Sequence, residues 1–167
     1  MVDERLVPIY EEESNFRLIN QVLNQIIPKE NLHPYIFDKD NNSYGIKAYE
    51  EEIKKFRGKF DIVLVSAGED GHIASLYPNH PSISDSSDYY IYIDNSPKPP
   101  NLRMSASKNM ILRSKIGIIL FYGEIKKDAY LNFLNKNMDY ISCPAKLISE
   151  IPESYVITNL NEGEINS

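Results

Sequence analysis

Residues 60–78 read Phe-Asp-Ile-Val-Leu-Val-Ser-Ala-Gly-Glu-Asp-Gly-His-Ile-Ala-Ser-Leu-Tyr-Pro, an apolar run followed by a glycine-rich turn. The run over 60–66 is rich in β-branched residues, which is typical of a strand buried on both faces of a parallel sheet. The segment 67–71 predicts a tight turn, because glycine adopts backbone conformations closed to other residues. We expect 72–76 to form a short helix after this turn, with His72 in its first turn.

Helix and strand patterns alternate on both sides of this unit. Apolar residues at helical spacing predict a helix over 14–27, with Ser14 as N-cap. A second helix is predicted over 46–56, with Ala48, Tyr49, Ile53 and Phe56 on its buried face. The remaining predicted elements are strands at 89–94, 115–122 and 155–158 and helices at 107–113 and 124–135. This alternation predicts an α/β fold, a three-layer, Rossmann-like sandwich with a mostly parallel sheet.

Within that sheet we expect the strands at 60–66 and 115–120 to be central. The chain shows neither an internal repeat nor a low-complexity linker, and its 167 residues suit one domain. We therefore expect residues 1–167 to form a single domain.

Composition excludes several classes of function. The net charge of −6 argues against nucleic-acid binding, which needs an excess of Lys and Arg on one face. The longest apolar run, 116–122, is too short to span a bilayer, and the first residues do not resemble a secretion signal. A single cysteine, Cys143, rules out an internal disulfide and favours the reducing cytoplasm.

The turn after the 60–66 strand carries residues suited to catalysis. In open α/β sheets, ligands bind beyond the carboxyl ends of the strands. Gly68 and Gly71 allow the backbone to approach a ligand closely, and His72 can act as a base near neutral pH, oriented by Asp70. The alternative is a purely structural turn in which His72 caps a helix, and the residue pattern alone leaves both interpretations open.

Several motifs in the chain resemble those of one enzyme family. They are Gly-Glu-Asp-Gly-His-Ile-Ala-Ser-Leu-Tyr-Pro at 68–78, Ser-Pro-Lys-Pro-Pro at 96–100 with Arg103 downstream, Asp-Glu-Arg-Leu-Val-Pro at 3–8 with Ser-Asn-Phe-Arg at 14–17, and Phe-Tyr-Gly-Glu-Ile-Lys at 121–126. In this order they resemble the glucosamine-6-phosphate isomerase/6-phosphogluconolactonase family, most closely its lactonases.

The resemblance implies hydrolysis of 6-phospho-D-glucono-1,5-lactone to 6-phospho-D-gluconate in the oxidative pentose phosphate pathway. It implies that His72 activates water with Asp70 as its acidic partner, and that the substrate is held at Arg5, Gly68, Gly71, Lys98 and Arg103. General-base catalysis and charge-assisted binding of a phosphate suit these residue types. The chemistry needs neither a metal nor a cofactor. We expect the three cations to lie near His72, although alone each could be an ordinary solvated side chain.

The resemblance covers nearly all of this chain but only the later, larger part of the family domain. The family's opening strand–helix–strand units, with a Ser-Gly-Gly loop that helps to hold the phosphate, have no counterpart. We therefore expect an exposed sheet edge, uncovered apolar surface, and weak or absent activity of the chain alone. A fragment, a mis-started gene product, a fusion to glucose-6-phosphate dehydrogenase and a partner chain that supplies the section all remain open.

Two other functions compete with lactone hydrolysis. A glucosamine-6-phosphate deaminase would use Asp3 as the base that abstracts a proton, and an inactive paralogue would only bind a sugar phosphate. The residues 75–77 after the histidine motif and the 96–100 segment favour the lactonase.

Overall fold

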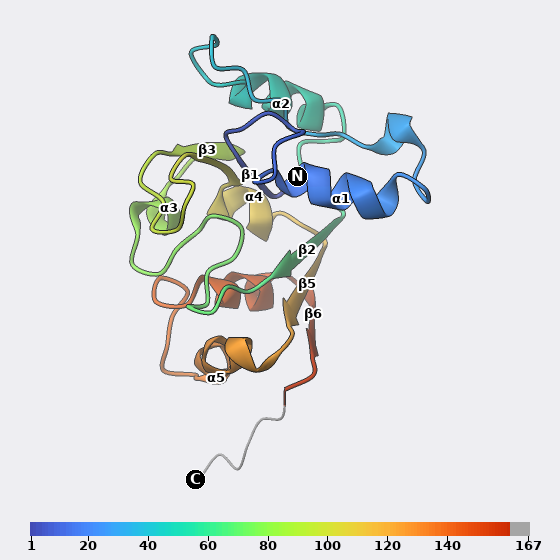
Figure 1. Cartoon of the computed structure of the whole chain (residues 1–167). Helices are drawn as coiled ribbons and strands as arrows, with labels where there is room; N and C mark the ends of the chain where they lie inside the picture. Colours follow the sequence, from blue (N-terminus) through green and yellow to red (C-terminus); the bar gives the residue numbers. More distant parts are fainter. Residues whose placement is uncertain (161–167) are drawn as a thin grey trace.

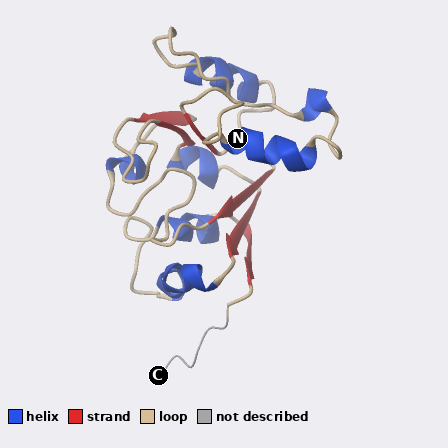
Figure 2. Cartoon of the chain, in the orientation of Figure 1, coloured by secondary structure: helices blue, strands red, loops and turns tan. Residues whose placement is uncertain are grey.

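Two three-stranded sheets share one hydrophobic core in the computed structural model, which describes residues 1–160 (Figures 1 and 2). The parallel sheet has the order β2–β5–β6, formed by Ile62–Ser66, Ile116–Phe121 and Glu153–Thr158. The antiparallel sheet has the order β1–β4–β3, formed by Asp3–Arg5, Arg103–Ala106 and Tyr90–Ile93. The expected α/β class is confirmed, whereas the separate antiparallel sheet was not predicted.

The helices surround these sheets. They are α1 (Asn15–Leu23), α2 (Ile46–Lys54), α3 (Pro81–Ser84), α4 (Lys108–Leu112) and α5 (Lys127–Leu134), with 3-10 turns η1 (Lys29–Asn31), η2 (Glu124–Lys126) and η3 (Pro144–Glu150). The helices predicted over 14–27, 46–56, 107–113 and 124–135 are confirmed but shorter, and α1 ends four residues before the expected 27. Tyr49 and Ile53 of α2 are buried as predicted, together with Ile46, whereas Ala48 and Phe56 are exposed. No helix within residues 1–160 is both long and apolar enough to cross a membrane.

Strands β2 and β5 pair in parallel, as predicted, with Ile62 opposite Ile116 and Ser66 opposite Leu120. Within the described residues β5 has a neighbour on each side, whereas β2 pairs with β5 alone. The expectation that both strands are central is therefore correct for β5 and wrong for β2. The free edge of β2 leaves its backbone groups open to pairing with another strand.

The two faces of the parallel sheet differ. Val63, Val65 and Ile119 are buried on one face, which α5 and η3 cover. On the other face, Ile62 and Leu64 are 57% and 55% exposed. The prediction that the 60–66 strand is buried on both faces is wrong, because no described element covers the second face. The expected uncovered apolar surface is present.

Helix α1 begins where two side chains satisfy its first backbone N–H groups. Ser14 Oγ accepts a hydrogen bond from Arg17 N at 3.2 Å, as predicted for the N-cap. The fully buried Glu4 carboxylate accepts from the N–H groups of Asn15 and Phe16, each at 2.7 Å, and from Ser14 Oγ at 3.0 Å. These bonds fix the start of α1 against β1, beside Arg5.

Candidate active site

The loop after β2 bends back on itself at residues 68–72. Gly68 N donates to His72 O at 2.7 Å, and Gly71 N donates to Gly68 O at 3.1 Å. Gly71 has a φ of 83°, a left-handed conformation that favours glycine. A Cβ at Gly68 would lie 2.0 Å from His72 Nδ1, so the imidazole occupies the space that any other residue at 68 would need.

The short helix predicted for 72–76 is absent. Asp70 Oδ1 accepts the His72 backbone N–H at 3.2 Å, and Ser75 N donates to Ser105 Oγ on β4 at 3.2 Å. Ala74 has a φ of 51°, which interrupts any helical run. In a helix starting at residue 72 the Ser75 N–H would donate to Gly71 O, but it donates to a distant strand, and Gly71 O accepts from Ala145 N at 2.9 Å.

His72 is oriented by Asp70. The imidazole Nδ1 lies 2.6 Å from Asp70 Oδ1, and a carboxylate can only accept, so Nδ1 carries the proton and Nε2 keeps a free lone pair. Burial lowers the His72 pKa below its usual 6.5; Asp70 opposes this shift, and the charge of Lys98 adds to it. Burial acts to raise the Asp70 pKa, but the bond and charge of His72 outweigh it and the pKa is lowered. The pair is therefore a neutral base with an ionised partner near neutral pH.

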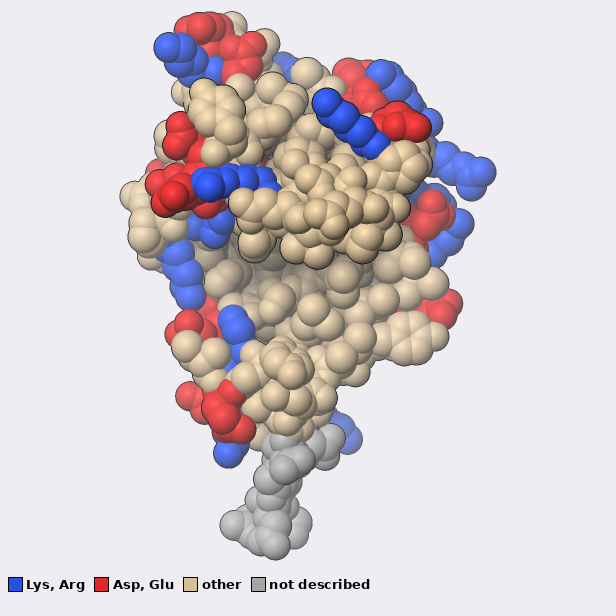
Figure 3. Space-filling model, turned by 45° about the vertical axis from the view of Figure 1, so that its right-hand side comes forward, with Lys and Arg blue, Asp and Glu red and all other residues tan. Residues whose placement is uncertain are grey.

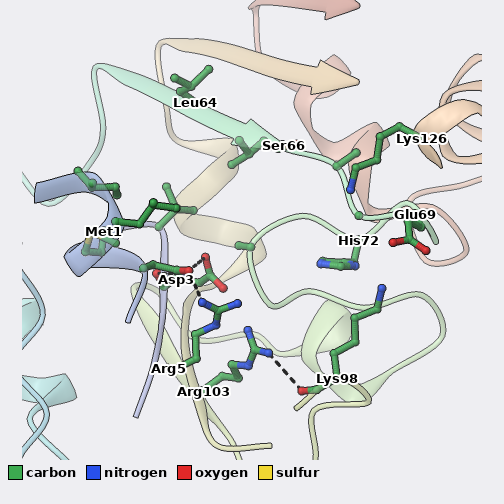
Figure 4. Close-up of a pocket in the computed structure, with 18 of the residues that line it drawn as sticks. Met1, Asp3, Arg5, Leu64, Ser66, Glu69, His72, Lys98, Arg103 and Lys126 are labelled. Carbon is green, nitrogen blue, oxygen red and sulfur yellow. Dashed lines mark hydrogen bonds between the residues drawn. The ribbon is translucent and has the colours of Figure 1, made fainter. Parts of the chain in front are cut away.

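His72 lies in a pocket of about 750 Å³ at the carboxyl end of β2. The same pocket is lined by Arg5 and, from a distant part of the sequence, by Lys98 and Arg103 (Figure 4). Gly68 also lines it, whereas Gly71 faces Cys143, whose Sγ would lie 3.0 Å from a Cβ at Gly71. The structure thus brings the predicted site residues together around His72, with Asp70 bonded to His72 at the edge of the pocket. Gly71 is the exception, because it packs against Cys143 outside the pocket.

Arg5 is held at the end of β1 by the start of α1. Its Nη1 donates to Glu13 O at 2.7 Å and to Asn15 Oδ1 at 2.5 Å. The Asn15 side-chain amide in turn donates to Asp3 O at 3.2 Å. Two carbonyl contacts thus orient the guanidinium without neutralising it, and its charge is available to an anion in the pocket.

Arg103 and Lys98 belong to one loop. Arg103 is only 5% exposed and donates from Nε to Pro100 O at 2.9 Å and from Nη2 to Pro99 O and Lys98 O at 2.9 and 3.2 Å. Arg103 therefore braces the loop that carries Lys98 as well as lining the pocket. Lys98 Nζ lies 3.8 Å from Asp70 Oδ2, with both side chains about 40% exposed, so solvent screens this ion pair.

Three residues in or beside the pocket were not assigned a role in the lactonase reaction from the sequence. Asp3 lines the pocket and accepts a hydrogen bond from Ser75 Oγ at 2.8 Å. Lys126 follows the glycine at the end of β5, and Figure 4 shows Lys126 and Lys98 reaching toward His72 from opposite sides. Tyr77 packs against the His72 ring, with centroids 5.0 Å apart. Lys126 could have been identified from the sequence, because it follows a glycine at the end of a predicted strand.

The arrangement suits addition of water to an anionic substrate. It provides a base with a free nitrogen lone pair and several cations around one pocket. Within residues 1–160, no group of three or more His, Cys, Asp and Glu side chains is placed to hold a metal ion. An α/β fold with such a site defines an enzyme that acts on a small phosphorylated or carboxylated molecule.

Comparisons with known proteins identify the family. The model of the family described as glucosamine-6-phosphate isomerases/6-phosphogluconolactonase matches residues 1–157. The 6-phosphogluconolactonase of Borreliella burgdorferi is 36% identical over 98% of this chain and 72% of its own length. The probable 6-phosphogluconolactonase 4 of Arabidopsis thaliana is 32% identical over 83% of this chain and 60% of its own length. The solved 6-phosphogluconolactonase of Thermotoga maritima matches with a TM-score of 0.79 at 26% identity, covering 94% of this chain and 70% of that one.

The chain belongs to the glucosamine-6-phosphate isomerase/6-phosphogluconolactonase family. The resemblance noted from the motifs is confirmed, and the curated relatives support a hydrolase of sugar-phosphate lactones. The chain spans 60% of the Arabidopsis relative and about three quarters or less of the others named above.

Proposed function

We propose that this chain hydrolyses 6-phospho-D-glucono-1,5-lactone to 6-phospho-D-gluconate, the hydrolytic step of the oxidative pentose phosphate pathway. The observation that carries the proposal is the His72 imidazole, 2.6 Å from Asp70, in one pocket with Arg5, Lys98 and Arg103. The relatives named as 6-phosphogluconolactonases support it.

In the proposed reaction, His72 Nε2 takes a proton from water while the water oxygen adds to the lactone carbonyl carbon. The carbonyl electron pair moves onto its oxygen, and cationic or N–H donors stabilise the oxyanion. Collapse of this intermediate breaks the bond to the ring oxygen, which takes the proton from the His72 imidazolium and becomes a hydroxyl group. The new carboxylic acid then loses its proton to solvent. Asp70 holds the tautomer and stabilises the imidazolium throughout.

We assign a role to each cationic side chain according to the charge and the N–H groups that its contacts within the protein leave free. Arg5 and Lys98 are suited to hold the phosphate, because their contacts leave their charge exposed to the pocket. Arg103 acts chiefly by bracing the loop, since Nε and Nη2 are committed to three backbone carbonyls. Lys126, which reaches toward His72 from the other side, is the candidate donor for the oxyanion.

We further propose that a segment from a fusion or a partner chain packs on the uncovered face of the parallel sheet. The relatives contain sequence that this chain does not span. Ile62 and Leu64 line the same pocket as His72, together with Leu18 of α1, and all three are more than half exposed. Figure 3 shows a broad, hollowed surface free of charged side chains on this side of the molecule. Exposed apolar patches of this kind mark interaction sites.

The cytoplasm is the location that we propose for this enzyme. Cys143 is the one cysteine of the chain; it is buried, and burial raises the pKa of its thiol. A protein that relies on packing rather than on disulfides suits a reducing compartment.

Lactone hydrolysis above the spontaneous rate is the test of the proposed function. The assay compares the chain alone with an extended form joined to the part of the Borreliella relative that it does not span, both in EDTA. We expect the extended form to be active and the chain alone to be weaker or inactive, because the pocket wall on the Leu64 side is open. A folded, inactive extended form would contradict the proposal. Release of ammonia from glucosamine 6-phosphate would instead favour a deaminase with Asp3 as its base.

The dependence on pH provides a separate prediction. His72 acts as a base only when neutral, so kcat/KM should fall as the pH drops through its pKa, which burial places below 6.5. Since the Lys98 charge lowers this pKa, Lys98→Met should move the acid limb to higher pH, and Asp70→Asn should move it to lower pH. Lys39→Met, at an exposed loop position outside the pocket, serves as the control. An acid limb that does not respond to Lys98→Met would show that another group controls it.

A further inference from the structure

The ring of Tyr77 forms one wall of the space that holds the His72 imidazole. Tyr77 is 1% exposed. Its ring centroid lies 5.0 Å from that of His72 at an interplanar angle of 45°, and 5.7 Å from that of His80 at 82°. Asp70 bonds one edge of the imidazole, and Tyr77 limits how far the ring can turn away from that bond.

The hydroxyl of Tyr77 contacts a second loop, the one that carries Lys98. Ser96 Oγ lies 2.9 Å from Tyr77 Oη and 2.8 Å from Lys98 O, and it accepts from Lys98 N at 3.2 Å. Ser96 has one hydroxyl hydrogen and Lys98 O can only accept, so that hydrogen goes to Lys98 O. The Tyr77 hydroxyl therefore supplies the hydrogen of the Tyr77–Ser96 bond, and every partner is satisfied.

We propose that Tyr77 is a positioning residue that holds the base His72 and the phosphate-binding Lys98 loop in one fixed arrangement. The proposal rests on the function proposed above. The other direct link between the two loops, the Lys98–Asp70 ion pair at 3.8 Å, is exposed and weak. The Tyr77–Ser96 bond is buried, with Ser96 only 4% exposed, and its loss would leave a buried hydroxyl without its partner.

Two substitutions separate the ring of Tyr77 from its hydroxyl. Tyr77→Phe keeps the packing on His72 and frees the Ser96 loop, so KM should rise about 2- to 10-fold with little change in kcat, as expected for one neutral hydrogen bond. Ser96→Ala should raise KM at least as much, because it also removes the Ser96 bonds to Lys98, and the double variant should show no further rise, because the Tyr77–Ser96 bond is already lost. Tyr77→Leu removes the ring, so kcat should fall and the His72 pKa, which NMR measures, should rise toward 6.5 as burial decreases.

Tyr35→Phe is the matched control. Tyr35 is fully buried, donates to Tyr44 O and lies outside the pocket, so its loss should lower stability without changing KM. If Tyr77→Phe behaves like Tyr35→Phe, Tyr77 is only structural and the proposal is overturned. A His72 pKa unchanged in a folded Tyr77→Leu would overturn the ring's role, and Tyr77→Phe carries the test if that variant does not fold. Absence of lactone hydrolysis in the unsubstituted extended enzyme would overturn the proposed function alone, since the NMR titration of His72 still reports on Tyr77.

Discussion

His72→Ala is expected to lower kcat for lactone hydrolysis by about 10²–10⁴-fold, the usual contribution of a general base. The imidazole is the group in the pocket that combines an oriented Nδ1–H with a lone pair on Nε2, and alanine removes both. KM should change little, because Arg5 and Lys98 rather than His72 hold the phosphate in this mechanism. The measurement is the steady-state rate of the extended form, corrected for spontaneous hydrolysis.

His33→Ala is the control for His72→Ala. His33 packs edge-on against Phe56 and pairs with Glu52 at 3.3 Å, away from the pocket that holds His72. This variant should keep its activity. If His72→Ala is as fast as the unsubstituted enzyme, His72 is not the general base and the proposed mechanism is refuted.

Strands β2 and β5 could be predicted from the sequence because the pattern that indicates each of them is local. The β-branched runs at 60–66 and 115–122 contain the residues that pair in β2 and β5, and a glycine follows each strand at the pocket end. What the run at 60–66 could not show is whether anything covers both of its faces. Ile62 and Leu64 are apolar yet exposed, and residues 1–160 do not supply the cover that we propose for them.

The helix predicted at 72–76 failed because its backbone bonds go to partners that the local pattern does not contain. The Ser75 N–H, which in a helix would donate to Gly71 O, donates to Ser105 Oγ thirty residues away, and Gly71 O accepts from Ala145 N. The role predicted for Arg103 was incomplete for a related reason. The family resemblance implied that Arg103 holds the substrate, but only the fold shows its guanidinium bound to the carbonyls of 98–100.

The proposed catalytic pair, His72 and Asp70, could be found from the sequence because its members are two residues apart. Tyr77 could not, since its contact with Ser96 depends on two loops that meet only in the folded chain. Residues that position a site through another side chain leave no spacing pattern, and the geometry of the fold is needed to find them.

Gly68→Ala is expected to lower kcat by about 10²-fold or more, although it adds only one methyl group. A Cβ at this position would lie 2.0 Å from His72 Nδ1 and 2.8 Å from Asp70 Oδ1, far inside normal contact distance. The side chain of His72 is 18% exposed, so the imidazole can turn toward solvent, and the Asp70–His72 bond would be lost. Because the base is then no longer oriented, the fall in kcat should approach that expected for His72→Ala. Thermal unfolding should show that the variant is folded.

A double variant distinguishes this explanation from a direct effect on the substrate. If alanine at 68 acts by displacing the imidazole, Gly68→Ala combined with His72→Ala should be no slower than His72→Ala alone, because the displaced group is already gone. Residues that act as one unit show this non-additivity. Losses that multiply would mean instead that Gly68 acts through a close approach of its backbone to the lactone. The steric conflict with His72 would then not be the cause of the lost rate.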